Sequence, residues 1–189
     1  MASLASAASA ANTTLRCITL VLGGARAGKS AYAERLIAEE LAPQQTALYI
    51  ATAEARDAEM AERIAQHRAQ RGAIWETREV PLALPDALRS ISRSDQPVLV
   101  DCLTLWMSNV LASEQDVGAA TRDLIAALKE ARGPVALVSN EVGLGIVPDN
   151  ALARAFRDHV GRLHQAIAEI ADRVVFVAAG LPLVLKEKK

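Results

Sequence analysis

One eight-residue stretch near the amino end of the chain restricts the possible folds more than any other feature. It reads Gly23-Gly24-Ala25-Arg26-Ala27-Gly28-Lys29-Ser30 and matches the pattern G-x-x-x-x-G-K-[ST]. It follows a continuous apolar run, Cys17 to Leu22, and precedes a helical pattern, Ala31 to Leu41. Such a stretch between a buried strand and a helix is typical of a loop that wraps its backbone N–H groups around phosphate oxygens. The sequence therefore predicts a strand, a phosphate-binding loop and a helix in succession.

Each fixed position of this loop has a physical reason. Glycine at positions 23 and 28 lets the backbone turn around phosphate oxygens without obstruction by a Cβ atom. Lys29 is expected to place a positive charge on the β- and γ-phosphates, and the Ser30 hydroxyl to bind Mg²⁺. All eight residues are therefore predicted to bind nucleotide. A glycine-rich turn without a ligand is the alternative, but average residue usage gives this pattern in fewer than about one in a hundred chains of this length.

Strand-like and helix-like segments alternate along the rest of the chain. Most of the strand-like segments are apolar at every position, which is typical of parallel strands covered on both faces. This alternation predicts a single α/β domain of the P-loop NTPase class, with a mostly parallel sheet and helices on both faces. The expected strands span 46–51, 74–80, 97–101, 135–139 and 174–178 with an edge at 183–185, and the expected helices span 57–71, 85–91, 121–131 and 151–171.

We place this domain at residues 17–189. Residues 1–16 are rich in Ala and Ser and lack the features of a secretory signal, so we expect a disordered extension there. No apolar run approaches the length of a membrane span, and the cytoplasm is the default location. The net charge of −1 gives no general attraction to nucleic acid or to an anionic membrane. Cys17 and Cys102 each adjoin an expected strand, where a buried thiol is expected rather than a disulfide or a zinc ligand.

A P-loop enzyme also needs a carboxylate near its metal ion, at the end of a neighbouring strand. Asp101 follows the apolar run 97–100 and meets this requirement. We predict that Ser30 and Asp101 hold Mg²⁺; the alternative role for Asp101 is a helix N-cap, because helix formers follow it. The chain has no Asn-Lys-x-Asp guanine-reading motif. A regulatory GTPase is therefore disfavoured, and a kinase, another phosphotransferase or an ATPase remains.

Three further stretches are unusual for a simple kinase. The first runs from Asp57 to Arg71, and the second is Asp101-Cys102-Leu103-Thr104-Leu105-Trp106-Met107-Ser108-Asn109. The third is Ser139-Asn140-Glu141-Val142-Gly143-Leu144-Gly145-Ile146-Val147-Pro148. Together with the start of the phosphate loop, they resemble the bifunctional adenosylcobinamide kinase/adenosylcobinamide-phosphate guanylyltransferase family of cobalamin biosynthesis. The resemblance covers Ile18 to Lys186, nearly the whole chain outside the extension.

The resemblance implies a RecA-like P-loop fold, a homotrimer and two reactions. In the first reaction, ATP or GTP phosphorylates the hydroxyl of the aminopropanol arm of adenosylcobinamide. In the second, GTP transfers GMP to an enzyme histidine and releases pyrophosphate. The GMP then passes to adenosylcobinamide phosphate, giving adenosylcobinamide-GDP. The expected partners are therefore ATP, GTP, Mg²⁺ and these two corrinoids.

The same resemblance assigns the histidine of the second reaction to His67. The family's nucleophile lies in an Arg-Ile-x-x-His-Arg pattern, which is residues 63–68 here. A neutral imidazole with an ordinary pKa of about 6.5 is a competent nucleophile. Arg63 and Arg71 lie four residues on either side of it on the expected helix, where they could hold a triphosphate. From the residues alone, a core histidine beside Met60 is an equally good interpretation.

The other two histidines, His159 and His164, lie on the expected helix 151–171, where a packing or surface role is expected. Relatives often have Asn at the position of His164, within Gly-Arg-x-Asn-Gln. Ala27 replaces a frequent Ser of the family's loop, which removes a hydroxyl but no backbone donor.

Further GTP contacts are implied by the resemblance at the ends of three strands and beyond the histidine. A solvated strand end is the alternative for Glu79. The residues concerned are Ala51, Thr52, Ala53, Arg68, Ala69, Gln70, Arg71, Glu79 and Asp101.

Two other functions fit the phosphate loop. A single-activity P-loop kinase for a small molecule would transfer phosphate without forming a stable nucleotidyl-enzyme. A regulatory or assembly module would bind nucleotide with negligible turnover, although the missing guanine-reading motif counts against it.

Overall fold

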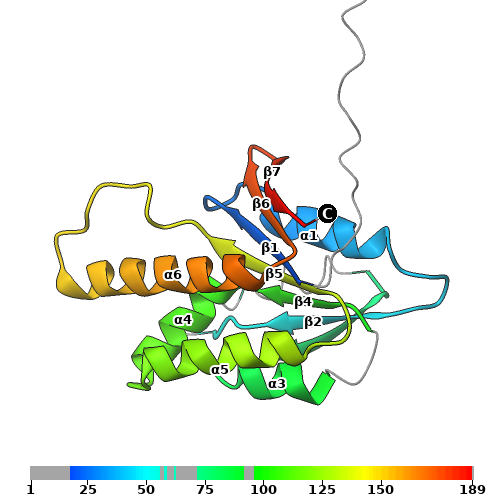
Figure 1. Cartoon of the computed structure of the whole chain (residues 1–189), viewed down its shortest axis with the longest axis horizontal. Helices are drawn as coiled ribbons and strands as arrows, with labels where there is room; N and C mark the ends of the chain where they lie inside the picture. Colours follow the sequence, from blue (N-terminus) through cyan, green and yellow to red (C-terminus); the bar gives the residue numbers. More distant parts are fainter. Residues whose placement is uncertain (1–17, 56–57, 59–61, 63–71, 92–95, 189) are drawn as a thin grey trace, which may run out of the picture.

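A computed structural model of the protein describes residues 18–55, 58, 62, 72–91 and 96–188. These residues form a seven-stranded sheet in the order β3-β2-β4-β5-β1-β6-β7 (Figure 1). The first six strands run parallel, and only β7 is antiparallel to its neighbour β6. The strands are β1 (Ile18–Gly23), β2 (Ala47–Ala51), β3 (Trp75–Glu79), β4 (Val98–Asp101), β5 (Val135–Asn140), β6 (Arg173–Ala178) and β7 (Leu181–Glu187).

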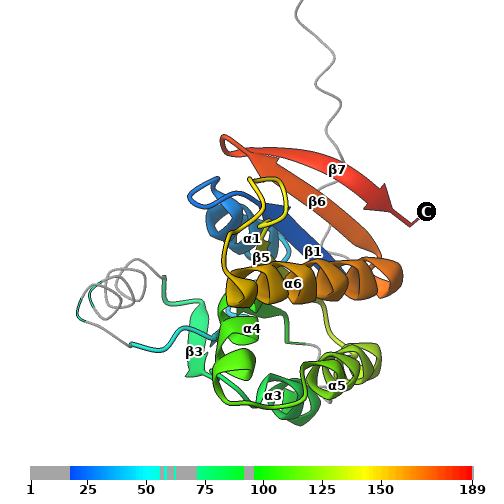
Figure 2. The ribbon, with the colours of Figure 1, turned by 90° about the vertical axis from the view of Figure 1, so that its left-hand side faces the viewer.

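Helices cover both faces of this sheet, as the apolar strands predict. Helix α1 lies on one face, and the other four described helices lie on the opposite face (Figures 1 and 2). The sequence of β5 shows why two cores form, since Val135 and Leu137 belong to one buried cluster and Ala136 and Val138 to the other. The helices are α1 (Lys29–Ala38), α3 (Leu84–Ile91), α4 (Leu103–Ala112), α5 (Val117–Glu130) and α6 (Ala151–Ile170).

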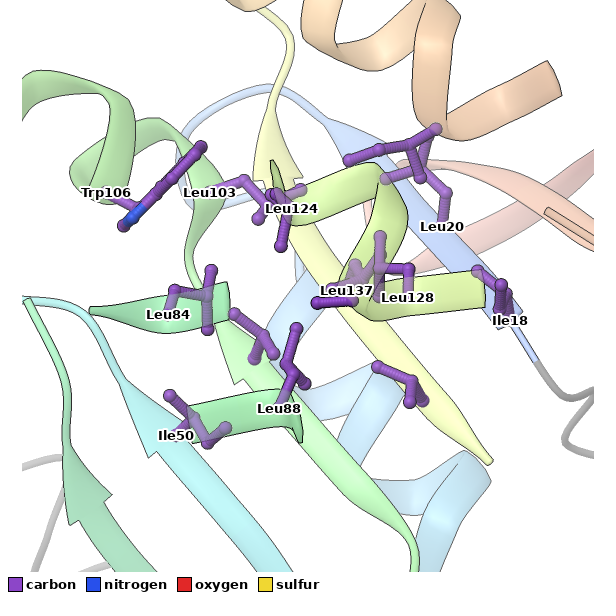
Figure 3. Close-up of a cluster of buried hydrophobic side chains, with 14 of the residues drawn as sticks. Ile18, Leu20, Ile50, Leu84, Leu88, Leu103, Trp106, Leu124, Leu128 and Leu137 are labelled. Atoms are coloured by element: carbon purple, nitrogen blue, oxygen red, sulfur yellow. The ribbon is translucent and has the colours of Figure 1, made fainter. Parts of the chain in front are cut away.

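The larger cluster fills the space between the sheet and α3 to α6. Its central side chains are buried almost completely, and burying a Leu or Ile side chain stabilises a fold by about 1.5–3 kcal/mol. Only 3% of the residues are aromatic, so aliphatic side chains supply most of this core. Figure 3 shows the side chains that gather there from three helices: Leu84, Leu88, Leu103, Trp106, Leu124 and Leu128.

Among the described residues, the predicted strands and helices agree with the structure apart from their ends, but helix α4 (Leu103–Ala112) was not predicted. Helix α5 begins at Val117, four residues before the predicted start, because the Asp116 side chain accepts a hydrogen bond from the Ala119 amide and caps it. The predicted edge strand is longer than expected and spans Leu181–Glu187. The predicted extension 1–16 and all but residues 58 and 62 of the predicted helix 57–71 lie outside the described residues. Over the described ranges, no helix is long and apolar enough to cross a bilayer.

Candidate nucleotide-binding site

The phosphate loop connects β1 to α1 at the edge of the sheet where the parallel strands end. Both of its fixed glycines are required by close approach to other backbone. A Cβ atom at Gly23 would lie 2.3 Å from the carbonyl oxygen of Val177 on the neighbouring strand β6. Gly28 has a φ of +94°, and a Cβ atom there would lie 3.2 Å from the Cα of Gly180. The predicted glycine positions thus have a structural reason even before a ligand is considered.

Lys29, the first residue of α1, points back over its own loop. Its Nζ donates a hydrogen bond of 2.6 Å to the carbonyl oxygen of Gly24. Lys29 is only 6% exposed. Burial lowers the pKa of its ammonium group, while the nearby Cys102 and Asp101 act in the opposite direction. A buried cation at the first turn of a helix is a strong attractor for phosphate, because the helix end adds its own positive potential.

Asp101 lies at the end of β4, close enough to Lys29 to influence its pKa. The hydroxyl of Tyr49 donates a hydrogen bond of 2.6 Å to Oδ2 of Asp101, which fixes the carboxylate. The alternative N-cap role of Asp101 is wrong, because the N-cap of α4 is Cys102, with no side-chain capping bond. The other oxygen, Oδ1, has no hydrogen-bond partner among the described residues, so it is available to a ligand.

These residues fit a magnesium ion bound together with nucleotide phosphates. Mg²⁺ prefers hard oxygen ligands and is usually held by one or two carboxylates, phosphate oxygens and water. Ser30 supplies a half-buried hydroxyl and Asp101 a carboxylate. The described residues contain no group of three or more His, Cys, Asp or Glu side chains arranged to hold a metal ion. Ser30 and Asp101 offer two oxygen ligands, so a bound Mg²⁺ would take its other ligands from phosphate and water.

The ends of β2, β3 and β4 bring three other predicted contact positions to this edge. In the sheet register, Ala51 pairs with Glu79 on one side and with Asp101 on the other. Ala51 is buried, Ala53 is half-buried and Glu79 is exposed. Nucleotide contacts by these residues stay predictions. His67 and the predicted contacts Arg68, Ala69, Gln70 and Arg71 lie outside the described residues.

Thr52, another predicted contact, joins the ends of β2 and β4. Its Oγ1 accepts a hydrogen bond of 2.9 Å from the Cys102 amide and donates one of 2.7 Å to the Cys102 carbonyl. Its backbone carbonyl accepts a further bond of 2.9 Å from Nδ2 of Asn109. Thr52 is fully buried, and this bonding gives its hydroxyl a structural role. A direct nucleotide contact by Thr52 stays a prediction.

Two features of the site were not found from the sequence. The first is the hairpin turn between β6 and β7, where Ala179 and Gly180 have φ values of +51° and +78°. The Gly180 amide donates a hydrogen bond of 2.9 Å to the carbonyl oxygen of Ala27 in the phosphate loop. A glycine between two apolar runs is a signal for such a hairpin. Its contact with the loop could not be inferred from local sequence.

The second feature is a buried chain of polar side chains beside the end of β5. His164 on α6 has Nε2 at 2.7 Å from Oγ of Ser139, and this Oγ is 3.1 Å from Oγ1 of Thr104. The backbone amide of Asn140 donates to Thr104 Oγ1 at 2.7 Å. Burial lowers the pKa of His164 to about 4, although Glu141 acts to raise it. The expected packing role of His164 is confirmed, and the histidine is neutral near pH 7.

The loop geometry, the buried Lys29 and the carboxylate at the end of β4 together define a P-loop nucleotide-binding protein. The model of the cobinamide kinase/cobinamide phosphate guanyltransferase family, CobU, matches residues 19–185. The chain belongs to this family and is therefore an enzyme of the kinase and guanyltransferase class that the family defines.

Curated relatives support this membership. The chain is 52% identical over 169 residues to the bifunctional adenosylcobalamin biosynthesis protein CobP of Pseudomonas aeruginosa, covering 88% of this chain and 96% of that protein. It is 41% identical over 182 residues to the bifunctional adenosylcobalamin biosynthesis protein CobU of Salmonella typhimurium, covering 88% and 98% of the two chains.

Solved structures support the fold at much lower sequence identity. The flagellar accessory protein FlaH of Methanocaldococcus jannaschii superposes with a TM-score of 0.55 at 17% identity, covering 91% of this chain and 79% of FlaH. A prototypical ATPase from the type III secretion system of pathogenic bacteria superposes with a TM-score of 0.52 at 10% identity, covering 89% of this chain and 56% of that ATPase. These likenesses concern the fold alone, and they agree with the predicted single-domain RecA-like architecture.

Proposed function

We propose that this protein catalyses two successive reactions of adenosylcobalamin biosynthesis. It phosphorylates adenosylcobinamide with ATP or GTP, and it then transfers GMP from GTP to adenosylcobinamide phosphate, giving adenosylcobinamide-GDP. The observation that carries the proposal is the phosphate loop with its buried Lys29, in a chain whose family unites the kinase and the guanyltransferase. Two curated relatives of this chain are each described as bifunctional.

In the phosphorylation, the described residues bind the nucleotide and orient its terminal phosphate. The loop amides and Lys29 hold the β- and γ-phosphates, and Lys29 would exchange its bond to the Gly24 carbonyl for phosphate oxygens. Ser30 and Asp101 would hold Mg²⁺, with Tyr49 fixing the carboxylate. When bound, the ion neutralises charge on the phosphate oxygens. Buried and preorganised charges of this kind stabilise a phosphoryl-transfer transition state more than solvated ones.

For the guanylyl transfer we propose His67 as the nucleophile, on the strength of the family resemblance of residues 63–68. Its nitrogen attacks the α-phosphorus of GTP and pyrophosphate leaves, forming a histidine–GMP intermediate. The phosphate group of adenosylcobinamide phosphate then takes the GMP and frees the histidine. Arg68, Ala69, Gln70 and Arg71 would contact the same GTP, together with Ala51, Thr52, Ala53 and Glu79.

We further propose a homotrimer that acts in the cytoplasm. The trimer rests on the family resemblance, and the edge strand β7 offers an apolar surface that a second copy could cover. Three of its leucines, Leu181, Leu183 and Leu185, are 57–72% exposed. Sedimentation equilibrium tests the state directly, and a mass near one chain of 20.1 kDa would contradict it.

The activity itself is tested with the purified full chain and GTP labelled at the α-phosphate. The label should remain on the protein after denaturing electrophoresis. Adenosylcobinamide phosphate added before denaturation should remove the label. A parallel assay with label at the γ-phosphate should show transfer to adenosylcobinamide. Phosphate transfer without protein labelling would favour the single-activity kinase. Nucleotide binding with neither phosphate transfer nor protein labelling would favour a regulatory module.

A further inference from the structure

Asn140 is the last residue of β5 and lies at the carboxyl end of this strand. Strand β5 lies between β1, which leads into the phosphate loop, and β4, which ends in Asp101 (Figure 1). In the register, Asn140 pairs with Gly23, and Val138 pairs with Asp101. The Asn140 backbone is therefore next to the first glycine of the loop.

The alternation along the strands indicates the direction of the Asn140 side chain. Ala136 and Val138 belong to the buried cluster on the α1 face, so Asn140, two residues further, faces the same side. Asp101 faces that side too, since Leu99 belongs to the same cluster. Lys29 begins α1 there. Asn140 thus shares the face and the sheet edge with the two charged groups of the site.

The backbone around Asn140 is held from both directions. Its own amide donates to Thr104 Oγ1 at 2.7 Å, and the Glu141 amide donates to the Gly23 carbonyl at 2.9 Å. Thr104 Oγ1 also contacts the buried hydroxyl of Ser139, and this hydroxyl contacts the imidazole of His164 on α6. The carboxamide itself is half-buried and makes no hydrogen bond to any other described residue. The backbone therefore holds this amide group, which has no partner among the described residues, next to the first glycine of the phosphate loop.

We propose that the Asn140 carboxamide donates a hydrogen bond from Nδ2 to the terminal phosphate of the bound nucleoside triphosphate during the kinase reaction. This inference rests on the proposed function of the site. The acceptor hydroxyl oxygen forms a bond to the γ-phosphorus, and the bond from that phosphorus to the bridging oxygen breaks. The nucleoside diphosphate leaves, and the hydroxyl proton passes to solvent. Charge on the γ-phosphoryl oxygens changes in this step, so a preorganised donor accelerates it.

The guanylyl transfer breaks a different bond, between the α- and β-phosphates, so the two reactions should respond differently to Asn140. Asn140→Ala should lower kcat of the kinase about 10²-fold, in the range known for loss of one preorganised donor. At saturating GTP, labelling of the protein from the α-phosphate should fall much less than kinase turnover, because the γ-phosphoryl group is not the group transferred in that step. Asn140→Asp keeps the shape but removes the donor and adds negative charge, so it should lower kcat further.

A binding measurement tests the contact without turnover. The full-length protein is titrated with a non-hydrolysable GTP analogue and with GDP, and the ratio of the two affinities is compared between variants. A hydrogen bond to a charged group contributes enough to change a binding constant about tenfold or more. The ratio should therefore fall about tenfold or more in Asn140→Ala, with GDP affinity unchanged. Asn150→Ala is the control, because this exposed asparagine caps α6 by accepting from the Ala153 amide and is remote from the loop in sequence.

The outcomes separate this inference from the function on which it rests. If wild type neither transfers phosphate nor takes up label, the proposed function fails, and the affinity ratio still reports on Asn140. An affinity ratio and a kinase rate within threefold of wild type in folded Asn140→Ala would overturn the inference. So would an equal loss of GDP affinity, which would mean that the substitution disturbs the whole loop. Should Asn140→Ala fail to fold, the isosteric Asn140→Asp decides by the same two measurements.

Discussion

The amide of Gly180 in the β6–β7 hairpin donates a hydrogen bond of 2.9 Å to the carbonyl oxygen of Ala27 in the phosphate loop. The hairpin is far from the loop in sequence, yet it supports the turn that precedes Gly28. Gly180 has a φ of +78°, a conformation that side chains rarely adopt. The shape of the loop therefore depends on a turn at the edge of the sheet.

Gly180→Ala should destabilise the protein by about 1–2 kcal/mol, the cost of a left-handed conformation for a residue with a Cβ atom. Open space surrounds the position, so backbone strain is the only expected cause. Chemical denaturation measures the change. Gly161→Ala in α6 is the matched control, because Gly161 also lies in open space but in a helix. It should raise stability by about 0.5–1 kcal/mol. Equal effects of the two substitutions would contradict this account.

Lys29→Ala should lower kinase turnover by about 10²–10³-fold, because the β- and γ-phosphates lose their buried cation. Guanylyl transfer should also weaken, since it uses the same triphosphate. Steady-state rates with adenosylcobinamide as acceptor provide the measurement. Lys129→Ala, an exposed lysine of α5, serves as the control for loss of a positive charge. Kinase turnover within threefold of wild type in Lys29→Ala would show that Lys29 does not bind the phosphates during the reaction.

Asp101→Asn should raise the Mg²⁺ concentration needed for half-maximal activity without unfolding the protein. The amide oxygen of Asn can still accept the hydrogen bond from Tyr49, but the negative charge that would attract the ion is gone. Activity is measured against Mg²⁺ concentration for both proteins. Tyr49→Phe removes only the hydroxyl, so a smaller shift is expected for it. An unchanged metal dependence in Asp101→Asn would leave the carboxylate with a structural role.

The buried His164 should make the protein less stable in mild acid. Its pKa is about 4 in the folded protein and about 6.5 when unfolded. As pH falls below about 6.5, the unfolded chain takes up the proton first, so stability declines until pH reaches about 4 and the effect levels off. The total loss is about 3 kcal/mol.

The test compares the pH dependence of unfolding in wild type and His164→Asn. The asparagine does not titrate, so the stability difference between the two proteins should change by this amount between pH 6.5 and 4. His159→Asn, half-exposed on the same helix, controls for loss of a histidine. Parallel stability curves for wild type and His164→Asn would show that His164 does not titrate as inferred.

Local patterns in the sequence were sufficient to predict most of the fold and the position of the phosphate loop between β1 and α1, although helix α4 was not predicted. Apolar runs such as Val135–Ser139 mark parallel strands because both faces are buried, and the phosphate loop is specified by its own eight residues. The start of α5 was missed because Val117 to Ala120 carries little helical periodicity, while the Asp116 cap sets the start. The contacts of Gly180 and Asn140 depend on strand order, in particular on β5 between β1 and β4, and local sequence does not encode that order.

His67 is the proposed nucleophile of the guanylyl transfer. A bond between phosphorus and a histidine nitrogen is a phosphoramidate, which acid cleaves and alkali leaves intact, whereas an acyl phosphate of Asp or Glu is cleaved by alkali. Label from the α-phosphate of GTP should therefore stay on the denatured protein at high pH and be lost at low pH. His67→Ala should abolish this labelling and the guanylyl transfer.

Kinase activity should persist in His67→Ala, because phosphate passes directly to the substrate hydroxyl and needs no nucleophile from the enzyme. The groups proposed for that step, Lys29, Ser30 and Asp101, lie on β1–α1 and β4, away from residue 67 in sequence. His159→Ala and His164→Ala should still take up label, since the first is half-exposed on α6 and the second is bonded to Ser139. Continued labelling of His67→Ala would exclude His67 as the nucleophile. An equal loss of kinase activity in the folded variant would mean that both reactions, and not only the guanylyl transfer, depend on His67.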